Sequence, residues 1–93
     1  MKYDIRRTSQ FKADFKLMLK RGANIIEFQN VLTLLANGEV IPDKYRDHPL
    51  QNSRDFKNCR ELHINPDWLL VYKYSNDYLI LYLIRTGSHS DLF

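Results

Sequence analysis

The stretch that decides the fold is residues 68–85, which read WLLVYKYSNDYLILYLIR. It holds two runs rich in aromatic and β-branched residues, Trp68 to Tyr74 and Tyr78 to Arg85. Such runs favour β-strands, and the polar triplet Ser75-Asn76-Asp77 between them is typical of a turn. The stretch therefore predicts an antiparallel hairpin.

A third strand is expected just before this hairpin, from Phe56 to Ile64, with Asn65-Pro66-Asp67 as the connecting turn. Facing residues in an antiparallel pair have a constant index sum and point to the same side of the sheet. If Asn65-Pro66 and Asn76-Asp77 are the central turn residues, Trp68 faces both His63 and Arg85. These three side chains are then predicted to form one row, although a slip of one residue in either turn would break it.

Two helices are expected upstream, after a short edge strand from Tyr3 to Arg7. Ser9 is the expected N-cap of the first helix, and Gly22 is expected to end it. The apolar residues of this helix follow the helical period and are predicted to face the core: Phe11, Phe15, Met18 and Leu19.

The second helix is expected to begin after Asn24, which stands in the capping-box relation to Glu27. Asn37-Gly38 is expected to end it. Its apolar set also has helical spacing and predicts a buried stripe: Phe28, Val31, Leu32 and Leu35. Because few residues separate the two helices, they are expected to form an antiparallel helical hairpin.

Residues 39–54 contain Pro42, Pro49 and many polar groups, and they are predicted to form a loop. The expected element order is β-α-α-β-β-β. This order predicts an α+β fold in which an N-terminal strand and a two-helix hairpin pack on one face of a mainly antiparallel sheet. We expect residues 1–93 to form a single domain.

Composition narrows the class of protein. The formal net charge is +3 and the sequence pI is about 9.1, a balance that favours polyanionic partners. No apolar run is long enough to span a bilayer, and the N-terminus lacks the apolar core of a signal peptide, so we expect a cytoplasmic protein. Cys59 is the single cysteine, which excludes an internal disulfide and a zinc site built from several cysteines.

Histidines in the second half of the chain suggest chemistry on RNA. His48, His63 and His89 each lie near groups that suit phosphodiester cleavage, among them Asp67 and Arg85. Imidazole transfers protons near neutral pH, and a guanidinium can bind two phosphate oxygens at once. The set suggests a metal-free ribonuclease. Because the His-x₃-His spacing of a metal site is absent, we expect neither a metal nor a cofactor.

Further residues are candidates for holding RNA. Trp68 and Phe93 offer aromatic faces for unpaired bases. Phosphate contacts are expected from cations on the first helix: Lys12, Lys16, Lys20 and Arg21. Each has a simpler alternative, because Trp68 can be a core residue and the lysines can be a solvated helix face. His48 can bond a loop carbonyl, and Arg85 can pair with Glu61.

Three motifs together carry a family resemblance: YRDHPL at residues 45–50, RELHINPDWLLVYK at residues 60–73, and RTGSH at residues 85–89 followed by a terminal Leu92-Phe93. In this order and spacing they resemble the YafQ-type toxins of the RelE/ParE superfamily, which are mRNA interferases of type II toxin–antitoxin modules. The resemblance covers the whole chain and implies the microbial-RNase-like arrangement of an antiparallel sheet with helices.

The resemblance also implies an activity. The toxin would enter the ribosomal A site and cut mRNA there through attack of a ribose 2′-hydroxyl on the adjacent phosphate. His89 would be the general acid, and His63 or His48, with Asp67 nearby, the general base. Arg85 would hold the phosphate, with Trp68 and Phe93 as substrate contacts.

The resemblance implies partners as well. They are the ribosome, mRNA and a cognate antitoxin, and operator DNA would be reached only through that antitoxin. A non-catalytic gyrase inhibitor on the same fold and a plain nucleic-acid-binding module remain the alternatives.

Overall fold

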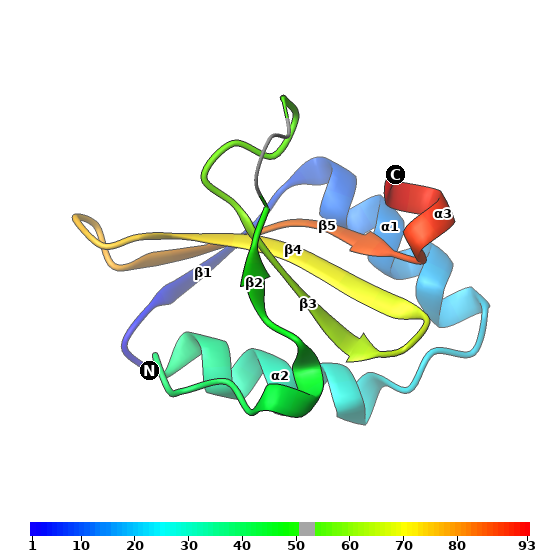
Figure 1. The fold of residues 1–93 in the computed structure, drawn as a ribbon, viewed down its shortest axis with the longest axis horizontal. Helices are drawn as coiled ribbons and strands as arrows, with labels where there is room; N and C mark the ends of the chain where they lie inside the picture. Colours follow the sequence, from blue (N-terminus) through cyan, green and yellow to red (C-terminus); the bar gives the residue numbers. More distant parts are fainter. Residues whose placement is uncertain (51–53) are drawn as a thin grey trace.

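The computed structural model describes residues 1–50 and 54–93 (Figure 1). The helices and strands follow one another in this order: β1 (Asp4–Arg7), α1 (Ser9–Lys20), α2 (Ile25–Ala36), the 3₁₀-helix η1 (Asp43–Tyr45), β2 (His48–Pro49), β3 (Arg60–Asn65), β4 (Trp68–Ser75), β5 (Ile80–Gly87) and α3 (His89–Leu92). None of the helices in the described part of the chain is long and apolar enough to cross a membrane.

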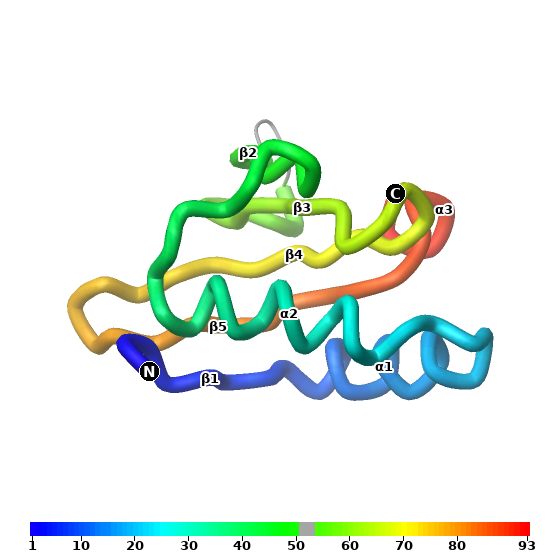
Figure 2. The backbone as a smooth tube through the Cα atoms, turned by 90° about the horizontal axis from the view of Figure 1, so that it is seen from below, coloured from blue at the N-terminus to red at the C-terminus, as the bar shows by residue number. Residues whose placement is uncertain are grey.

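The strands of the described residues form one sheet in the order β1-β5-β4-β3-β2. Strands β2 to β5 pair antiparallel with their neighbours, whereas β1 pairs parallel with β5 at the edge of the sheet. The predicted α+β fold with a mainly antiparallel sheet is therefore confirmed, and so is the edge position of the N-terminal strand. Figure 2 shows α2 running back past α1, as expected of an antiparallel helical hairpin.

Both helices pack on one face of the sheet, which we call the helix-covered face. The core there joins apolar side chains of the two helices to alternate residues of three strands: Phe11, Met18, Phe28, Val31 and Leu35 from the helices, and Leu62, Ile64, Trp68, Leu70, Tyr72, Leu81 and Leu83 from the sheet. The predicted helical stripes are confirmed except at Leu19, which is 40% exposed. Asp14 is buried in α1 instead, because it pairs with Arg85.

The helix ends differ from expectation at two points. The N-cap of α1 is Thr8, not Ser9, because the Thr8 hydroxyl both accepts from Phe11 N–H and donates to the Ile84 carbonyl of the sheet. Asn24 caps α2 as predicted, since its side chain accepts from the Ile26 N–H.

The predicted capping-box contact of Glu27 is not among the capping contacts of α2. The Glu27 carboxylate accepts from the side chain of Asn65 instead, which ties the start of α2 to the β3–β4 turn.

The region between α2 and β4 holds more structure than predicted. Residues 39–50 are not a plain loop, because they contain η1 and the short strand β2; residues 51–53 lie outside the described residues. The strand expected from Phe56 begins only at Arg60, after Asn58 with its positive φ of 62°. Likewise β5 begins at Ile80 rather than Tyr78, because Leu79 turns the chain at φ 52°.

The predicted row of His63, Trp68 and Arg85 is wrong. The turns fall later than assumed, so Asn65 faces Trp68, His63 faces Leu69, and Ser75 faces Ile80. The pairing register also shifts within each strand pair, between His63 and Asn65 in β3–β4 and between Val71 and Tyr72 in β4–β5. Because side chains alternate along a strand, the altered register sends Trp68 into the core of the helix-covered face.

The other face of the sheet, which we call the open face, carries a smaller apolar cluster. Leu69 and Val71 of β4 pack there against Phe56, Cys59 and Leu92. Burial raises the pKa of the Cys59 thiol, so this cysteine remains a protonated, small apolar residue. Figures 1 and 2 both place α3 and the β3–β4 turn at one end of the sheet, with the β4–β5 turn at the opposite end.

Candidate active site

The strand register gathers chemically active residues into two rows on the open face. His48 faces Glu61, Glu61 faces Val71, and Val71 faces Arg85, so one row crosses four strands. In the adjacent row, His63 faces Leu69, which faces Gly87, two residues before His89. Directly opposed residues share a face, so these groups surround the small apolar cluster around Leu69 and Val71.

Glu61 lies between two imidazoles. Its Oε1 is 3.6 Å from Nε2 of His48 and 3.8 Å from Nε2 of His63, and the two rings are 6.4 Å apart. The Glu61 side chain is only 8% exposed, and its Oε2 has no hydrogen-bond partner among the described residues. A buried carboxylate is costly unless neighbouring groups compensate it, so Glu61 depends on the two histidines.

His48 is oriented from both sides. Its Nδ1 is 2.6 Å from the carbonyl oxygen of Arg46, a geometry in which Nδ1–H donates and Nε2 is left facing Glu61. Assignment of the proton to Nδ1 follows from this hydrogen bond. The ring is therefore held with one nitrogen on the backbone and the other directed at the open face.

A polar cluster fixes β2 on β3 and thereby fixes His48. The carboxylate of Asp47 accepts from Nε and a terminal nitrogen of Arg60, at 3.3 and 3.1 Å, and from the hydroxyl of Tyr72. Burial and the Asp47 carboxylate raise the pKa of Tyr72, so its hydroxyl stays protonated and donates. These bonds explain why a two-residue strand is formed in a segment with so few apolar residues.

Arg85 is anchored by the buried carboxylate of Asp14 on α1. Its Nε donates to Oδ2 of Asp14 and one terminal nitrogen donates to Oδ1, each at 2.9 Å. The Thr86 N–H donates to the same carboxylate at 3.2 Å. Because β1 ends at Arg7, α1 takes the place of a neighbouring strand along the end of β5. One edge of the Arg85 guanidinium is thus held, and its other terminal nitrogen has no hydrogen-bond partner among residues 1–50 and 54–93.

His89 begins the short helix α3, which the sequence did not predict. Ser88 and Asp91 form a capping box, and Asp91 also binds Arg21 at 2.6 Å. That guanidinium lowers the pKa of Asp91 well below its usual range. A Cβ atom at Gly87 would lie 3.0 Å from Asp91, so glycine permits this close return of the chain.

The exposed His89 ring lies 5.3 Å from the ring of Phe93. Phe93 is 54% exposed and meets Phe56 edge-on at a ring distance of 5.8 Å. His89 and Phe93 therefore lie together at the end of the chain, and Arg21, predicted to bind RNA, is engaged in holding their helix.

Other predicted site residues lie elsewhere. Trp68 is 1% exposed and its Nε1 donates to Thr86 at 2.7 Å, so its ring is a core residue and not a stacking face. Asp67 lies in the β3–β4 turn, and within residues 1–50 and 54–93 no hydrogen bond or ion pair joins its carboxylate to His63; it lines a small hollow with Arg21 and Trp68. The three predicted lysines of α1, Lys12, Lys16 and Lys20, are exposed.

Two residues central to this geometry were not predicted as site residues. The sequence suggests Glu61 only as a partner for Arg85, although Glu61 lies two residues before His63 on a predicted strand, where both side chains share one face. Asp14 lies in a lysine-rich helix, and the sequence signal for its burial is its position on the apolar stripe beside Phe11 and Met18.

The arrangement suits proton transfer around a bound phosphate. One side of the apolar cluster carries an imidazole pair with a shared carboxylate, and the other side carries a guanidinium and a third imidazole. Among the described residues, no group of three or more His, Cys, Asp or Glu side chains is placed to hold a metal ion. In general, placed imidazoles can act as general acid and base, and a guanidinium can bind two phosphate oxygens.

Comparisons with known proteins agree with this fold. Residues 3–93 match the family of bacterial toxins of type II toxin–antitoxin systems named YafQ. The mRNA interferase toxin YafQ of Escherichia coli strain K12 is 40% identical over 91 residues, which cover 97% of this chain and 95% of the relative.

Solved structures are similar over nearly the whole chain. In the crystal structure of the E. coli DinJ–YafQ complex, the matching chain is 40% identical with a TM-score of 0.86, and 98% of each chain is covered. A metal-bound toxin from Helicobacter pylori is 37% identical with a TM-score of 0.90, covering 98% of this chain and 99% of that one.

The fold and the match over residues 3–93 place the chain in the class of small toxins from type II toxin–antitoxin systems. Within that class, the full-length match and the identity of about two residues in five settle the family. The chain belongs to the YafQ family.

Proposed function

We propose that this toxin is an mRNA interferase, an endoribonuclease that cuts mRNA in the ribosomal A site without a metal ion. The observation that carries the proposal is the row His48–Glu61–Val71–Arg85 with His63 in the adjacent row, which sets a carboxylate between two imidazoles on the same face as the Arg85 guanidinium. Its relative in E. coli carries the name mRNA interferase.

In the proposed reaction, His63 or His48 removes the proton of a ribose 2′-hydroxyl, and the 2′-oxygen forms a bond to the adjacent phosphorus. The bond from phosphorus to the 5′-oxygen of the next nucleotide breaks, and His89 protonates that oxygen. The products are a 2′,3′-cyclic phosphate and a 5′-hydroxyl. Each placed proton transfer contributes ~10²–10⁴-fold to the rate.

The remaining groups orient the reactants. Glu61 replaces Asp67 in the role of the carboxylate beside the base, because it is the carboxylate that faces both imidazoles. The unpaired nitrogen of Arg85 binds a phosphate oxygen, while Asp14 fixes the direction of the guanidinium. Asp67 remains a candidate substrate contact at the β3–β4 turn, and Phe93 a stacking surface beside His89.

Partners follow from the same proposal. Lys12, Lys16 and Lys20 would contact ribosomal RNA phosphates, and the toxin would act in the cytoplasm, where the ribosomes are. A cognate antitoxin would bind it, as DinJ binds YafQ in the E. coli complex. Any contact of the complex with operator DNA would be made by the antitoxin.

Cleavage in a translation system of purified components tests the proposal. Messages programmed in the A site should be cut by the wild-type protein, equally with and without EDTA pretreatment of the toxin. A single 2′-deoxy substitution on the 5′ side of the cut should abolish cleavage there, because the attacking hydroxyl is gone. An intact message on active ribosomes, or cleavage of the 2′-deoxy message at the same linkage, would overturn it. Gyrase-dependent DNA breaks without RNA cleavage would favour the alternative inhibitor.

A further inference from the structure

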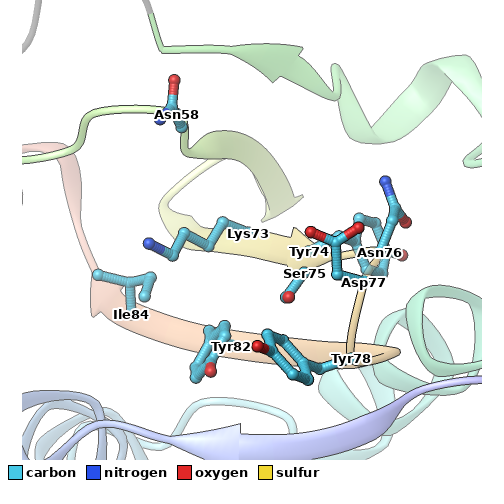
Figure 3. A pocket seen from close by; sticks show the side chains of 9 residues that line it. All are labelled: Asn58, Lys73, Tyr74, Ser75, Asn76, Asp77, Tyr78, Tyr82 and Ile84. Carbon is cyan, nitrogen blue, oxygen red and sulfur yellow. The ribbon is translucent and has the colours of Figure 1, made fainter.

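The open face carries a second concave surface at the opposite end from the histidines. It is a groove of about 720 Å³ over β4 and β5, next to the β4–β5 turn. Figure 3 shows Lys73, Tyr82 and Ile84 along it, with Tyr78 and Asp77 at the turn and Asn58 across from them. None of these residues has a part in the chemistry proposed above.

The register places a tyrosine of this groove between two cations, one that lines the groove and one on the adjoining edge strand β1. Tyr82 faces Arg6 on β1 and Lys73 on β4, so the three side chains form a row on one face. The Lys73 amino group lies 5.8 Å from the centre of the Tyr82 ring. Within the described residues, neither Arg6 nor Lys73 has a carboxylate in ion-pair distance.

This row lies on the same face as the candidate active site. Lys73 follows Val71 by two residues on β4, and β-strand side chains alternate, so both point to the open face. From Leu69, which faces His63, to Lys73 the strand advances four residues, or roughly 13 Å. A strand of RNA a few nucleotides long can reach from one place to the other.

The turn that borders the groove is fixed from beneath. The Tyr3 hydroxyl donates to Asn76 at 3.0 Å, and the Tyr74 hydroxyl donates to the carbonyl of Leu35 at 2.7 Å. Burial raises the pKa of Tyr74 to about 12, so that donor persists over the whole physiological range. The groove is therefore preformed rather than assembled on binding.

The chemistry of the row selects its ligand. An aromatic ring with cations on both sides suits a base that stacks on the ring while its flanking phosphates meet the cations. Figure 3 shows the Lys73 amino group directed away from the Asp77 carboxylate, which stands at the turn. A net charge of +3 further favours a negatively charged ligand such as RNA.

We infer that this groove binds single-stranded RNA that flanks the cleaved linkage, with a base on Tyr82 and phosphates at Lys73 and Arg6. The inference rests on the proposed function for the identity of the strand. It adds a substrate subsite at the far end of the sheet, so that the toxin holds mRNA at two places.

Fluorescence anisotropy with a labelled single-stranded oligoribonucleotide of about ten nucleotides tests the inference. Complete 2′-O-methylation of the probe removes the attacking hydroxyl, so binding is measured without cleavage and independently of the proposed chemistry. Tyr82→Leu, which keeps apolar bulk but loses the aromatic face, should weaken binding roughly tenfold. Tyr82→Phe should bind like the wild type.

The cation arm uses Lys73→Gln and a matched control, Lys2→Gln. Lys2 also lies over a tyrosine ring, at 5.4 Å from Tyr3, but it does not line the groove. Lys73→Gln should reduce the slope of log affinity against log salt by about 0.7, the value for one phosphate contact on a single strand. Lys2→Gln should leave that slope unchanged. Thermal unfolding of every variant shows whether the fold is retained.

Several outcomes would overturn the inference. Wild-type affinity in both folded Tyr82→Leu and Lys73→Gln would remove the subsite, and so would equal losses in Lys73→Gln and Lys2→Gln. Preference for duplex RNA, unaffected by Tyr82→Leu, would also contradict it. A loss of antitoxin affinity with unchanged RNA affinity would make the groove a protein-docking surface instead. The two proposals can fail separately. A-site cleavage without binding of the oligonucleotide would remove the subsite alone, and binding of the oligonucleotide without A-site cleavage would remove the proposed function alone.

Discussion

The two faces of the sheet are built on different physical terms. On the helix-covered face, many apolar side chains together exclude water, and alternate residues of β3, β4 and β5 pack against two helices. On the open face, a small apolar cluster is surrounded by a few polar groups. The orientation of each polar group depends on one or two contacts, such as those of Glu61 with two histidines.

That difference separates stability from chemistry. Burial on the helix-covered face is roughly proportional to apolar area and tolerates changes of shape. The proton transfers proposed for the open face need particular atoms at particular distances. We therefore expect substitutions on one face to change the free energy of unfolding, and substitutions on the other to change the cleavage rate.

The largest expected effect is on the open face, at His89. Replacing His89 by Ala removes the proposed proton donor and should slow single-turnover cleavage on ribosomes by ~10²–10⁴-fold. Its side chain is exposed, so the thermal unfolding midpoint should stay close to that of the wild type. The neighbouring exposed residue supplies a matched control, Ser90→Ala, which should cleave normally. Wild-type rates in His89→Ala would remove this residue from the chemistry.

The reverse case is Leu81, which is fully buried on the helix-covered face. Leu81→Ala should lower the free energy of unfolding by ~2–5 kcal/mol, because it removes apolar contacts and leaves a cavity. At a temperature where the variant is folded, the cleavage rate per folded molecule should be unchanged. Denaturant unfolding and single-turnover cleavage measured together check both parts. A large loss of rate in folded Leu81→Ala would show that the two faces are not separable.

Asp14 links the two faces and should affect both. Burial alone raises the pKa of its carboxyl, but hydrogen bonds from Arg85, Gln10 and the Thr86 N–H outweigh burial and hold the pKa below the ordinary 3.8. Asp14→Asn should cost ~1–3 kcal/mol at neutral pH and slow cleavage roughly tenfold, since Arg85 loses its anchor.

The pH dependence of that cost has a defined sign. A carboxyl with a lowered pKa in the folded state contributes stability above its unfolded pKa, and loses it as pH falls through the folded value. The difference in unfolding free energy between the wild type and Asp14→Asn should therefore be full above pH 3.8 and shrink as the pH falls below it. Urea unfolding over a pH series measures this. A difference that grows toward acid pH would contradict the role given to Asp14.

The smallest expected effect concerns the start of α1. Thr8→Ala should cost ~0.5–2 kcal/mol, because the hydroxyl caps Phe11 N–H and also bonds the sheet at Ile84. Ser9→Ala should cost little, since Ser9 is the first helical residue and not the cap. Equal losses of unfolding free energy for the two substitutions would contradict the observed cap. A slower cleavage rate per folded molecule in Thr8→Ala would contradict the separation of the two faces.

The helix-covered face was the more predictable from sequence. Its helices, the hairpin and most of its core follow from periodicities that depend on neighbouring residues in the chain. The open face depends on register, which a bulge or a longer turn changes without any obvious sequence signal. For that reason Trp68 was expected beside Arg85 and lies instead in the core, while Glu61 gained the position between the histidines.

The candidate site was predictable in its residue types more than in its geometry. His48, His63, Arg85 and His89 were identified from motif spacing, but their distribution over two rows needed the pairing of β2 with β3. That pairing depends on Asp47, Arg60 and Tyr72, which are far apart in sequence. Long-range polar contacts of this kind have no local pattern.

Glu61→Gln tests the central claim most directly, because it keeps the size of the side chain and removes the charge between His48 and His63. The rate of single-turnover A-site cleavage should be measured across pH together with thermal stability. We predict a properly folded variant whose rate falls by roughly 10–100-fold and whose pH profile differs from that of the wild type. A folded Glu61→Gln protein with the same rates and the same pH profile as the wild type would contradict the claim that this carboxylate and its two histidines act together in the reaction.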